Sequence, residues 1–418
     1  MSRAPLRALL ALCALIGAGE VRAAGAPDPL AIPVAIAAEL RQADGATRLT
    51  FTLSHPVEAR AFVMERPDRV VIDLPEVNFQ LPGDSGRRPD GVVASFRYGL
   101  FAPGRSRVVV DLAQPARVAR VETVRRPVDG ASLLTLEFAR VDRDAFRAAA
   151  RAEPEAPPKP VALPRPRSDK RPVIVLDPGH GGVDPGAMPA AGVAEKDIVF
   201  AFAQRLRQRL QESGRYRVVL TREQDVFVSL DDRVRIAREA GADLMISIHA
   251  DSISTAPYVR GLTVYTGSER ASDLESARLA ERENTADAAG GVEGRNGSDE
   301  VADILHDLTL RETRGLSNRF AGTLVGALES VMRLNRNPHR QAGFRVLRAA
   351  DIPAVLLELG YLSSPKDMDL LTSDEWRDRS SAAMASAIER YFESKVAHGP
   401  AIVPAAAAGE GSPAPVSP

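Results

Sequence analysis

The sequence predicts an α/β domain with a mostly parallel sheet flanked by helices, preceded by a small all-β sandwich domain. Short runs in the first third of the chain alternate apolar and polar residues, and apolar strand-like runs alternate with helical periodicity in the last half. A Pro-rich stretch separates these two patterns. The length of 418 residues allows two or three domains with substantial cores.

Residues 1–23 have the pattern of a Sec-type signal peptide. Arg3 and Arg7 precede an apolar run at 8–16, which is too short to span a bilayer, and small residues lead up to Ala23. We expect cleavage after about Ala23. Because the only cysteine, Cys13, lies in this segment, the mature chain would have no thiol.

The charge balance argues against nucleic acid as a partner. The chain has 54 Lys and Arg residues against 55 Asp and Glu residues, so it lacks the excess positive charge that a polyanion attracts. Only residues 8–16 form an unbroken apolar run, so we expect no membrane span in the mature protein.

Residues 32–145 form the predicted β module. Its strand-like runs are RLTFTL from Arg48, RVVIDL from Arg69, RVVVDL from Arg107 and LLTLEF from Leu133. Alternation at period two, with turn residues between the runs, favours antiparallel strands. RVVIDL and RVVVDL also resemble an internal repeat, which favours a pseudo-symmetric sandwich. This module has no cluster of ligand residues, so we expect it to bind a partner, with a purely structural role as the alternative.

Two segments have the composition of unstructured chain. Residues 146–171 are rich in Pro, Ala and charge, which favours an extended linker between two domains. Residues 398–418 are rich in Ala and Pro without apolar periodicity, which predicts a disordered tail.

Residues 172–397 change to an alternation of strand and helix. The predicted strands are 172–177, 217–221, 243–249, 261–266, 343–347 and 353–358, and the predicted helices are 197–210, 230–240 and 375–395. Strands that alternate with helices are typical of a mostly parallel sheet with helices on both faces.

Candidate site residues occur where the predicted strands end. His180 follows the first strand, His249 ends the third, and Glu358 ends the last. Because ligands of open α/β sheets bind beyond the carboxyl ends of the strands, these side chains are expected to converge. Glu195 opens the next helix within reach of His180. Two histidines and one carboxylate suit a zinc ion that keeps its fourth position for water.

Such a site would suit amide hydrolysis. Zinc lowers the pKa of bound water and polarises a carbonyl, and Glu358 could then transfer protons. Asp177 or Asp184 is a candidate to orient a histidine ligand. The neighbouring glycines allow a tight turn and leave room for substrate; they are Gly179, Gly181 and Gly182.

The same residues carry a family resemblance. The matching segments are VIVLDPGHGGVDPGA at 173–187, Glu195, SIHAD at 247–251, GLTVYT at 261–266, AEREN at 280–284 and QAGFRVLRAADIPAVLLELGYLS at 341–363. Together they resemble the zinc-dependent N-acetylmuramoyl-L-alanine amidases of bacterial cell separation over essentially all of residues 172–395. The N-terminal module resembles the AMIN domain, which targets such amidases to peptidoglycan.

The resemblance implies zinc bound by His180, Glu195 and His249, with Glu358 as the catalytic carboxylate. The implied reaction is cleavage of the amide between the lactyl group of N-acetylmuramic acid and L-Ala of the stem peptide. The resemblance also implies a periplasmic protein that acts at the division septum to separate daughter cells.

A regulatory segment is implied between Glu283 and Gly315. Several glycines precede an expected helix at 299–310, whose apolar face consists of Val301, Ile304, Leu305 and Leu308. Septal members of the resembled family carry an inserted helix that blocks the site until an activator protein displaces it, and their equivalent of Glu283 can take the fourth zinc position. Autoinhibition by residues 291–312 is therefore implied, with an ordinary packed helix as the alternative.

Two other functions stay open at this point. One is a different zinc hydrolase of the cell wall, such as a peptidase or a deacetylase. The other is a catalytically inactive wall-binding protein that activates other hydrolases. An inactive protein would be expected to lack Glu358 or a zinc ligand, and this sequence retains all four residues.

Overall fold

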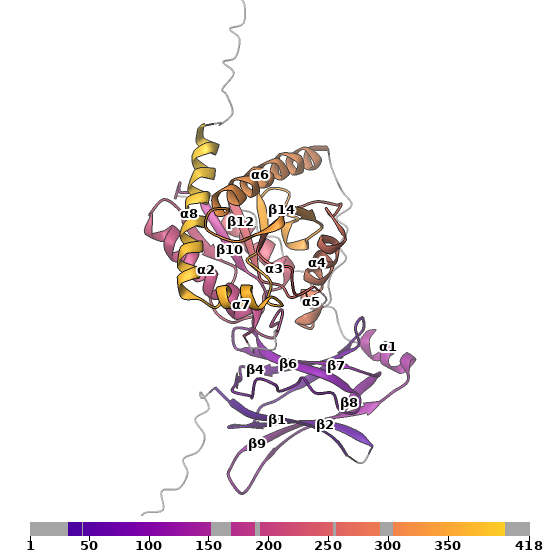
Figure 1. Cartoon of the computed structure of the whole chain (residues 1–418). Coiled ribbons are helices and arrows are strands. Elements are labelled where there is room, and N and C mark those ends of the chain that lie inside the picture. The colour runs from indigo at the N-terminus through magenta and orange to yellow at the C-terminus, as the bar shows by residue number, and fades with distance from the viewer. Residues whose placement is uncertain are drawn as a thin grey trace, which may run out of the picture. The chain divides into compact units, whose positions relative to one another are not determined.

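A computed structural model describes residues 32–43, 45–151, 169–188, 193–253, 256–292 and 304–397 (Figure 1). The expected signal peptide and tail lie outside the described residues, as do residues 152–168 of the expected linker. The first residues of that expected linker belong to a helix instead. This helix, α1, spans Arg143–Arg151, and it forms because Phe146 inserts into the core of the β module, where it is fully buried.

The β module is a sandwich of two sheets. Its strands are β1 Val34–Ala43, β2 Ala46–Leu53, β3 Arg60–Met64, β4 Arg69–Pro75, β5 Asn78–Phe79, β6 Val93–Ala102, β7 Arg105–Leu112, β8 Ala116–Arg125 and β9 Ser132–Arg140. One sheet has the order β5-β1-β2-β9-β8 and the other the order β3-β4-β7-β6. Inward residues of both sheets, among them Phe51, Ile72, Val108 and Leu134, form one core, so the predicted all-β architecture is confirmed.

The repeated RVVIDL and RVVVDL segments are neighbouring strands. β4 and β7 pair antiparallel, so Arg69 lies opposite Asp111 and Asp73 lies opposite Arg107. The antiparallel register converts the repeat into two cross-strand ion pairs, with N–O distances of 2.7 Å and 2.6 Å. The Arg of each repeated segment therefore pairs with the Asp of the other segment.

The second module is built on a six-stranded sheet with the order β11-β10-β12-β15-β13-β14. These strands span β10 Val173–Pro178, β11 Arg217–Leu220, β12 Leu244–His249, β13 Leu262–Gly267, β14 Leu334–Ala342 and β15 Ala354–Glu358. Only the β13–β15 pair is antiparallel. The predicted mostly parallel sheet is confirmed.

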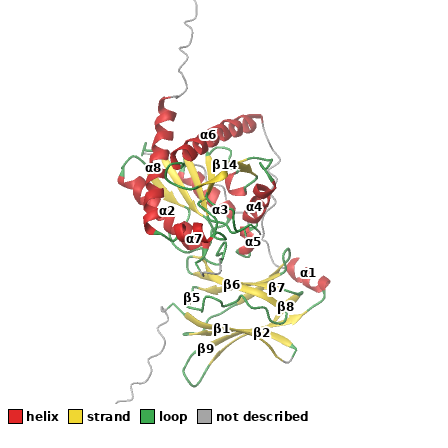
Figure 2. Ribbon diagram, in the orientation of Figure 1, coloured by secondary structure: helices red, strands yellow, loops and turns green. Residues whose placement is uncertain are grey.

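Helices cover both faces of this sheet (Figure 2). One face packs against α2 Glu195–Glu212, α6 Ile304–Leu328 and α8 Asp374–Ala397. The other face packs against α3 Leu230–Ala240, α4 Leu274–Asn284 and the short 3-10 helix η1 Arg345–Leu347. Two short helices, α5 Ala286–Ala289 and α7 Pro365–Leu371, complete the described elements.

The predicted strand at 343–347 is wrong. The strand β14 ends at Ala342, and the next residues turn into η1. Phe344 and Val346 are buried as a strand would require, but the amide of Arg345 donates a hydrogen bond to the side chain of Asn284 rather than to a neighbouring strand. β14 itself escaped prediction because its polar sequence is that of an edge strand, paired only with β13.

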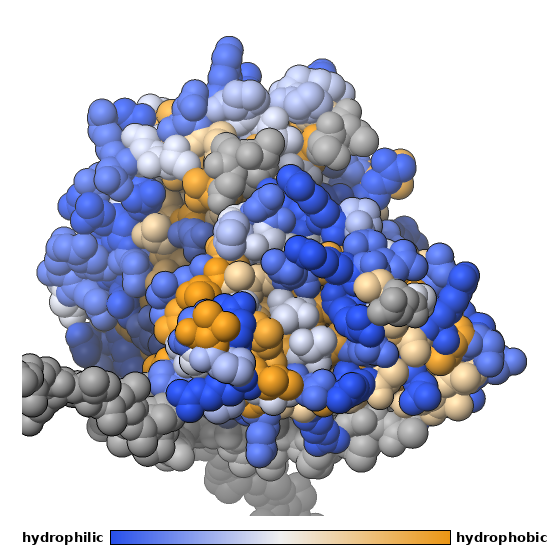
Figure 3. Space-filling view, turned by 90° about the horizontal axis from the view of Figure 1, so that it is seen from below, coloured by the Kyte–Doolittle hydropathy of each residue, from blue (hydrophilic) through white to orange (hydrophobic). Residues whose placement is uncertain are grey.

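On the face drawn in Figure 3, hydrophilic residues predominate and hydrophobic residues form limited groups. Among the described residues, no helix is long and apolar enough to cross a membrane.

Candidate metal centre

The candidate site lies at the carboxyl edge of the second sheet, on the face covered by α3 and α4. His249 and Glu358 end the parallel strands β12 and β15 as register partners, and Thr263 of β13 is the partner of Glu358 on the other side. Register partners on adjacent strands project to the same face of a sheet. His249, Glu358 and Thr263 therefore form one row across three strands.

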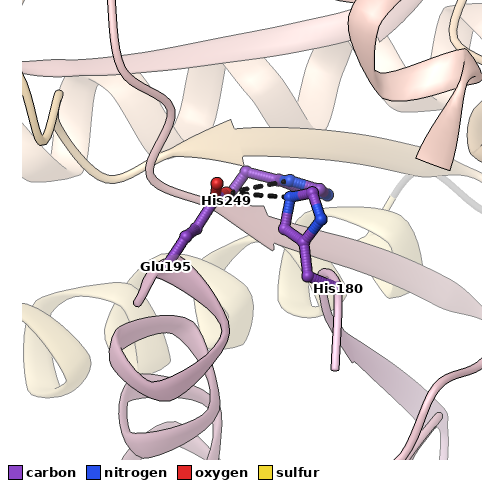
Figure 4. Close-up of side chains that lie close together, drawn as sticks. All are labelled: His180, Glu195 and His249. Atoms are coloured by element: carbon purple, nitrogen blue, oxygen red, sulfur yellow. Dashed lines mark ion pairs between the residues drawn. The ribbon is translucent and has the colours of Figure 1, made fainter. Parts of the chain in front are cut away.

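The loop after β10 and the start of α2 bring His180 and Glu195 to the same place (Figure 4). Oε1 of Glu195 lies 3.2 Å from Nε2 of His180 and 3.2 Å from Nδ1 of His249. Their potential ligand atoms all lie within 4.8 Å of one another, and all three residues are buried. The structure thus brings together the three residues that the sequence suggested as metal ligands.

The donor set fits a zinc ion. Nε2 of His180 and Nδ1 of His249 are buried and have no hydrogen-bond partner among the described residues, which is costly unless something else binds them. Ligands at 2.0–2.1 Å from a tetrahedral zinc ion are about 3.3 Å apart, close to the 3.2 Å that separates Oε1 of Glu195 from each of the two nitrogens. The imidazole and carboxylate donors are also those that zinc prefers.

The carboxylate of Glu195 is held by the main chain. Its Oε1 accepts a hydrogen bond from the amide of Ala250, and its Oε2 accepts one from the amide of Ala187, each at 2.9 Å. Burial raises the pKa of Glu195, but His180 and His249 outweigh this effect and place the pKa well below its usual value. A lowered pKa favours the anionic form of Glu195, which is the form that binds a metal ion.

Asp184 orients the imidazole of His180. Its Oδ2 lies 2.8 Å from Nδ1 of His180, which leaves Nε2 facing Glu195. Burial lowers the pKa of His180, but the carboxylates of Glu195 and Asp184 outweigh burial and raise it well above the usual value. Of the two aspartates that the sequence offered for this role, Asp184 contacts the ring, whereas Asp177 bonds to Arg233, Thr221 and Ser247.

Two glycines allow the loop to approach the site. A Cβ atom on Gly179 would lie 2.4 Å from the ring of His249. A Cβ atom on Gly186 would lie 2.6 Å from the ring of His180 and 2.7 Å from Oε2 of Glu195, and Gly186 has a φ of 65°. Only glycine fits at either position.

Glu358 is fully buried beside this cluster. Its Oε2 accepts a hydrogen bond from the amide of Asp251 at 2.9 Å, and its Oε1 has no partner in the part of the chain that the structure describes. Burial raises the pKa of Glu358, and the carboxylates of Asp251, Glu195 and Glu283 raise it further, to well above the usual value. A carboxyl group of this kind is suited to exchanging protons near neutral pH.

Glu283, near the end of α4, reaches the same cluster. Its Oε2 lies 3.2 Å from Nδ1 of His249 and 3.6 Å from Nε2 of His180. On either side of it, Arg282 forms an ion pair with Asp251, and Asn284 bonds to the main chain at Gly343 and Arg345. Oε2 of Glu283 therefore lies beside the same two ring nitrogens that face Glu195.

The regulatory helix is described only in part. Val301 lies outside the described residues, whereas positions 304, 305 and 308 belong to the first turns of α6. The described part of the helix expected at 299–310, from position 304 on, belongs to a much longer helix, which continues to Leu328 because its later residues, including Phe320 and Leu324, pack on the sheet.

Sequence reasoning missed three charged residues around the site: Arg222, Arg233 and Asp251. For two of them, Arg233 and Asp251, the sequence contained a feature that could have pointed to them. Arg233 falls on the buried stripe of α3 between Leu230 and Ala237, where a charge needs a partner. Asp251 directly follows the strand that ends in His249.

Comparison with known families assigns both modules. Residues 174–390 match the Amidase_3 family of N-acetylmuramoyl-L-alanine amidases. The chain belongs to this amidase family. Residues 37–132 of the amidase match the AMIN domain.

Curated relatives extend over most of the amidase. It is 35% identical over 377 residues to N-acetylmuramoyl-L-alanine amidase AmiC of Neisseria meningitidis serogroup B, covering 84% of this chain and 88% of that protein. It is 30% identical over 381 residues to AmiC of Escherichia coli O6:H1, covering 87% of this chain and 90% of that protein. A solved structure of amidase AmiC2 from Nostoc punctiforme covers 53% of this chain and 97% of its own, with 28% identity and a TM-score of 0.39.

Proposed function

We propose that this chain is a zinc-dependent hydrolase that cleaves the amide between N-acetylmuramic acid and L-alanine in peptidoglycan. The observation that carries the proposal is the pair of unpartnered buried nitrogens, Nε2 of His180 and Nδ1 of His249, both facing Oε1 of Glu195. The names of the curated relatives support the choice of substrate.

His180, Glu195 and His249 would hold the zinc ion. When bound, zinc would act as a Lewis acid that polarises the amide carbonyl and lowers the pKa of water. The main-chain amides that hold Glu195 and the carboxylate that orients His180 keep the ligand atoms in place before any metal arrives.

Glu358 would move the proton. As the new C–O bond forms, it takes a proton from the attacking water, and as the C–N bond breaks, it delivers a proton to the amine of L-Ala. Its burial and its raised pKa suit both transfers, and the hydrogen bond from Asp251 holds the carboxylate in one orientation.

We also infer that the structure represents an autoinhibited state. Oε2 of Glu283 would take the position that water needs; its distances of 3.6 Å to Nε2 of His180 and 3.2 Å to Nδ1 of His249 support this inference. The segment 291–312 follows this residue, and an activator protein that displaces it would free the site. Deletion of 291–312, or Glu283→Gln, is expected to raise hydrolysis of purified sacculi; unchanged or lower hydrolysis in both would contradict autoinhibition.

The remaining modules fit a secreted wall enzyme. We propose that residues 1–23 direct export to the periplasm, that residues 32–145 bind peptidoglycan, and that the enzyme acts in septal wall splitting during cell separation. Support comes from the apolar run at 8–16 and from the AMIN match at 37–132.

The deciding experiment combines metal analysis with mass spectrometry of released muropeptides. The proposal expects stoichiometric zinc and intact stem peptides that begin with L-Ala. Shortened peptides would indicate a peptidase, free acetate would indicate a deacetylase, and no product from the Glu283→Gln variant would indicate a wall-binding protein without activity.

A further inference from the structure

His180 has an unusual main-chain conformation. Its φ is 57°, in the left-handed region, and among the described non-glycine residues only Arg66 shares a positive φ. A histidine is strained there, and such residues persist where the surrounding structure holds them in place. The contacts of this loop show what holds it.

Two buried arginines bind three consecutive carbonyl groups of the loop. Arg233 donates to the oxygen of Pro178 at 2.9 Å and to the oxygen of His180 at 2.8 Å. Arg222 donates to the oxygen of Pro178 at 3.0 Å and to the oxygen of Gly179 at 3.1 Å. Every carbonyl from Pro178 to His180 therefore accepts a hydrogen bond from a guanidinium group.

The two arginines are themselves fixed by separate elements. Arg233 projects from the buried stripe of α3 and forms an ion pair with Asp177 at 2.7 Å, with both side chains almost fully buried. Arg222 follows β11, donates to the main chain of Lys196 at 2.8 Å and lies 4.7 Å above the ring of Phe200. Contacts from β10, β11, α2 and α3 thus converge on one loop.

The two positive charges of Arg222 and Arg233 lie close together, and this has an electrostatic cost. Burial lowers the pKa of Arg222, and the positive charge of Arg233 lowers it further, to about 10. Two neighbouring buried cations are unusual unless they serve a purpose, because each requires hydrogen bonds and a counter-charge. Here their shared contact is the loop that carries His180.

We propose that Arg222 and Arg233 are positioning residues for the metal centre: together they hold the main chain of His180 in its left-handed conformation, so that Nε2 faces Glu195 and His249. This inference rests on the proposed zinc site. Asp184 orients the ring from one side, and the two arginines hold the backbone from the other. Arginine is required because a lysine ammonium lacks the planar fork that reaches two carbonyl groups and Asp177 at once.

The test compares Arg233→Lys and Arg222→Lys with Arg340→Lys. Arg340 is also buried, but it bonds to Asn335, Asn337 and Glu275 on and beside β14. The full-length variants are titrated with zinc against a chromophoric chelator, and thermal unfolding of the zinc-free proteins measures the loss of stability.

The proposal expects the zinc affinity of both loop-binding variants to fall about 10- to 100-fold, while Arg340→Lys binds zinc like the wild type at a comparable loss of stability. The proposal would be overturned if the wild type and the three variants bound zinc with equal affinity. It would also be overturned if Arg340→Lys lost as much zinc affinity as Arg222→Lys and Arg233→Lys. If Arg233→Lys does not fold, Arg222→Lys decides by the same criterion. A wild-type protein that binds no zinc would instead refute the proposed function.

Discussion

Asp251 and Glu358, which are 107 residues apart, are joined by a hydrogen bond from the amide of Asp251 to Oε2 of Glu358. The bond connects the residue that follows β12 with the last residue of β15. It leaves Oε1 of Glu358 without a partner and therefore available to a substrate or a water molecule.

Glu358→Gln is expected to lower the turnover of sacculi by about 10²- to 10⁴-fold, because the amide side chain keeps the shape but cannot carry the proton. Zinc content should not change, since Glu358 is not among the grouped ligands. Dye release from labelled sacculi and metal analysis measure the two properties. Substantial retained activity would refute its catalytic role.

Removal of zinc is expected to abolish activity and to lower the unfolding temperature, and added zinc should restore both. A ligand at 100 times its Kd stabilises the folded state by about 2.7 kcal/mol. The variant His249→Ala provides the control, because its unfolding temperature should respond little to zinc. An unfolding temperature of the wild type that chelators leave unchanged would contradict the assignment.

Asp184→Asn is expected to weaken zinc binding by about 10- to 100-fold, because the ring of His180 loses the charged acceptor at Nδ1. The matched control is Asp225→Asn. Asp225 accepts from the amide of Gly182 in the same loop and from Lys196, but it does not contact a ligand. Chelator competition on both variants provides the comparison; similar losses would mean that the loop, and not the ring contact, sets the affinity.

Arg282→Gln is expected to raise basal turnover by up to about fivefold. The ion pair of Arg282 with Asp251 helps to hold the end of α4, and an ion pair with one half-exposed partner contributes up to about 1 kcal/mol. Arg278→Gln, an exposed arginine on the same helix, should leave turnover unchanged. If Glu283→Gln activates the enzyme and Arg282→Gln does not, the ion pair has no part in holding α4.

Stability is expected to depend on pH through Asp177. Burial raises its pKa, but Arg233, Thr221 and Ser247 outweigh burial and place it below 3.8. A depressed folded-state pKa means that this stabilisation is complete above pH 3.8 and is lost as the pH falls through the folded-state value.

Asp177→Asn should therefore cost about 3–5 kcal/mol near neutral pH, because it leaves Arg233 buried without its counter-charge. Urea unfolding of the zinc-free wild type and variant, repeated at decreasing pH, measures this difference. The difference should shrink as the pH falls below 3.8. A difference that does not vary with pH would contradict the ion pair.

Much of the fold followed from local patterns. Apolar runs bounded by turn residues located β10, β12 and β15, and polar residues at or just after the ends of these strands pointed to His180, His249 and Glu358. These features are local, because a strand that is buried on both faces must be apolar along its length, and its end is where polar groups reappear.

Elements whose pattern depends on distant neighbours escaped prediction. β14 is a polar edge strand, α4 was not distinguished from the segment around it, and the residues of η1 imitate a strand because Phe344 and Val346 are both buried. For η1 a tertiary contact overrides the local pattern, namely the hydrogen bond from the amide of Arg345 to the side chain of Asn284.

The sequence by itself determined the two fold classes, the identities of the candidate ligands and their places at strand ends, because these depend on residue type and short spacing. Only the tertiary structure decided that β15 lies between β12 and β13, which sets Glu358 beside His249. It also decided that Arg222 and Arg233 both bind the main chain of the loop that carries His180, and that Oε2 of Glu283 lies 3.2 Å from Nδ1 of His249. Strand order and helix docking are long-range choices, made by burying apolar faces and pairing buried charges, and no short window of residues contains them.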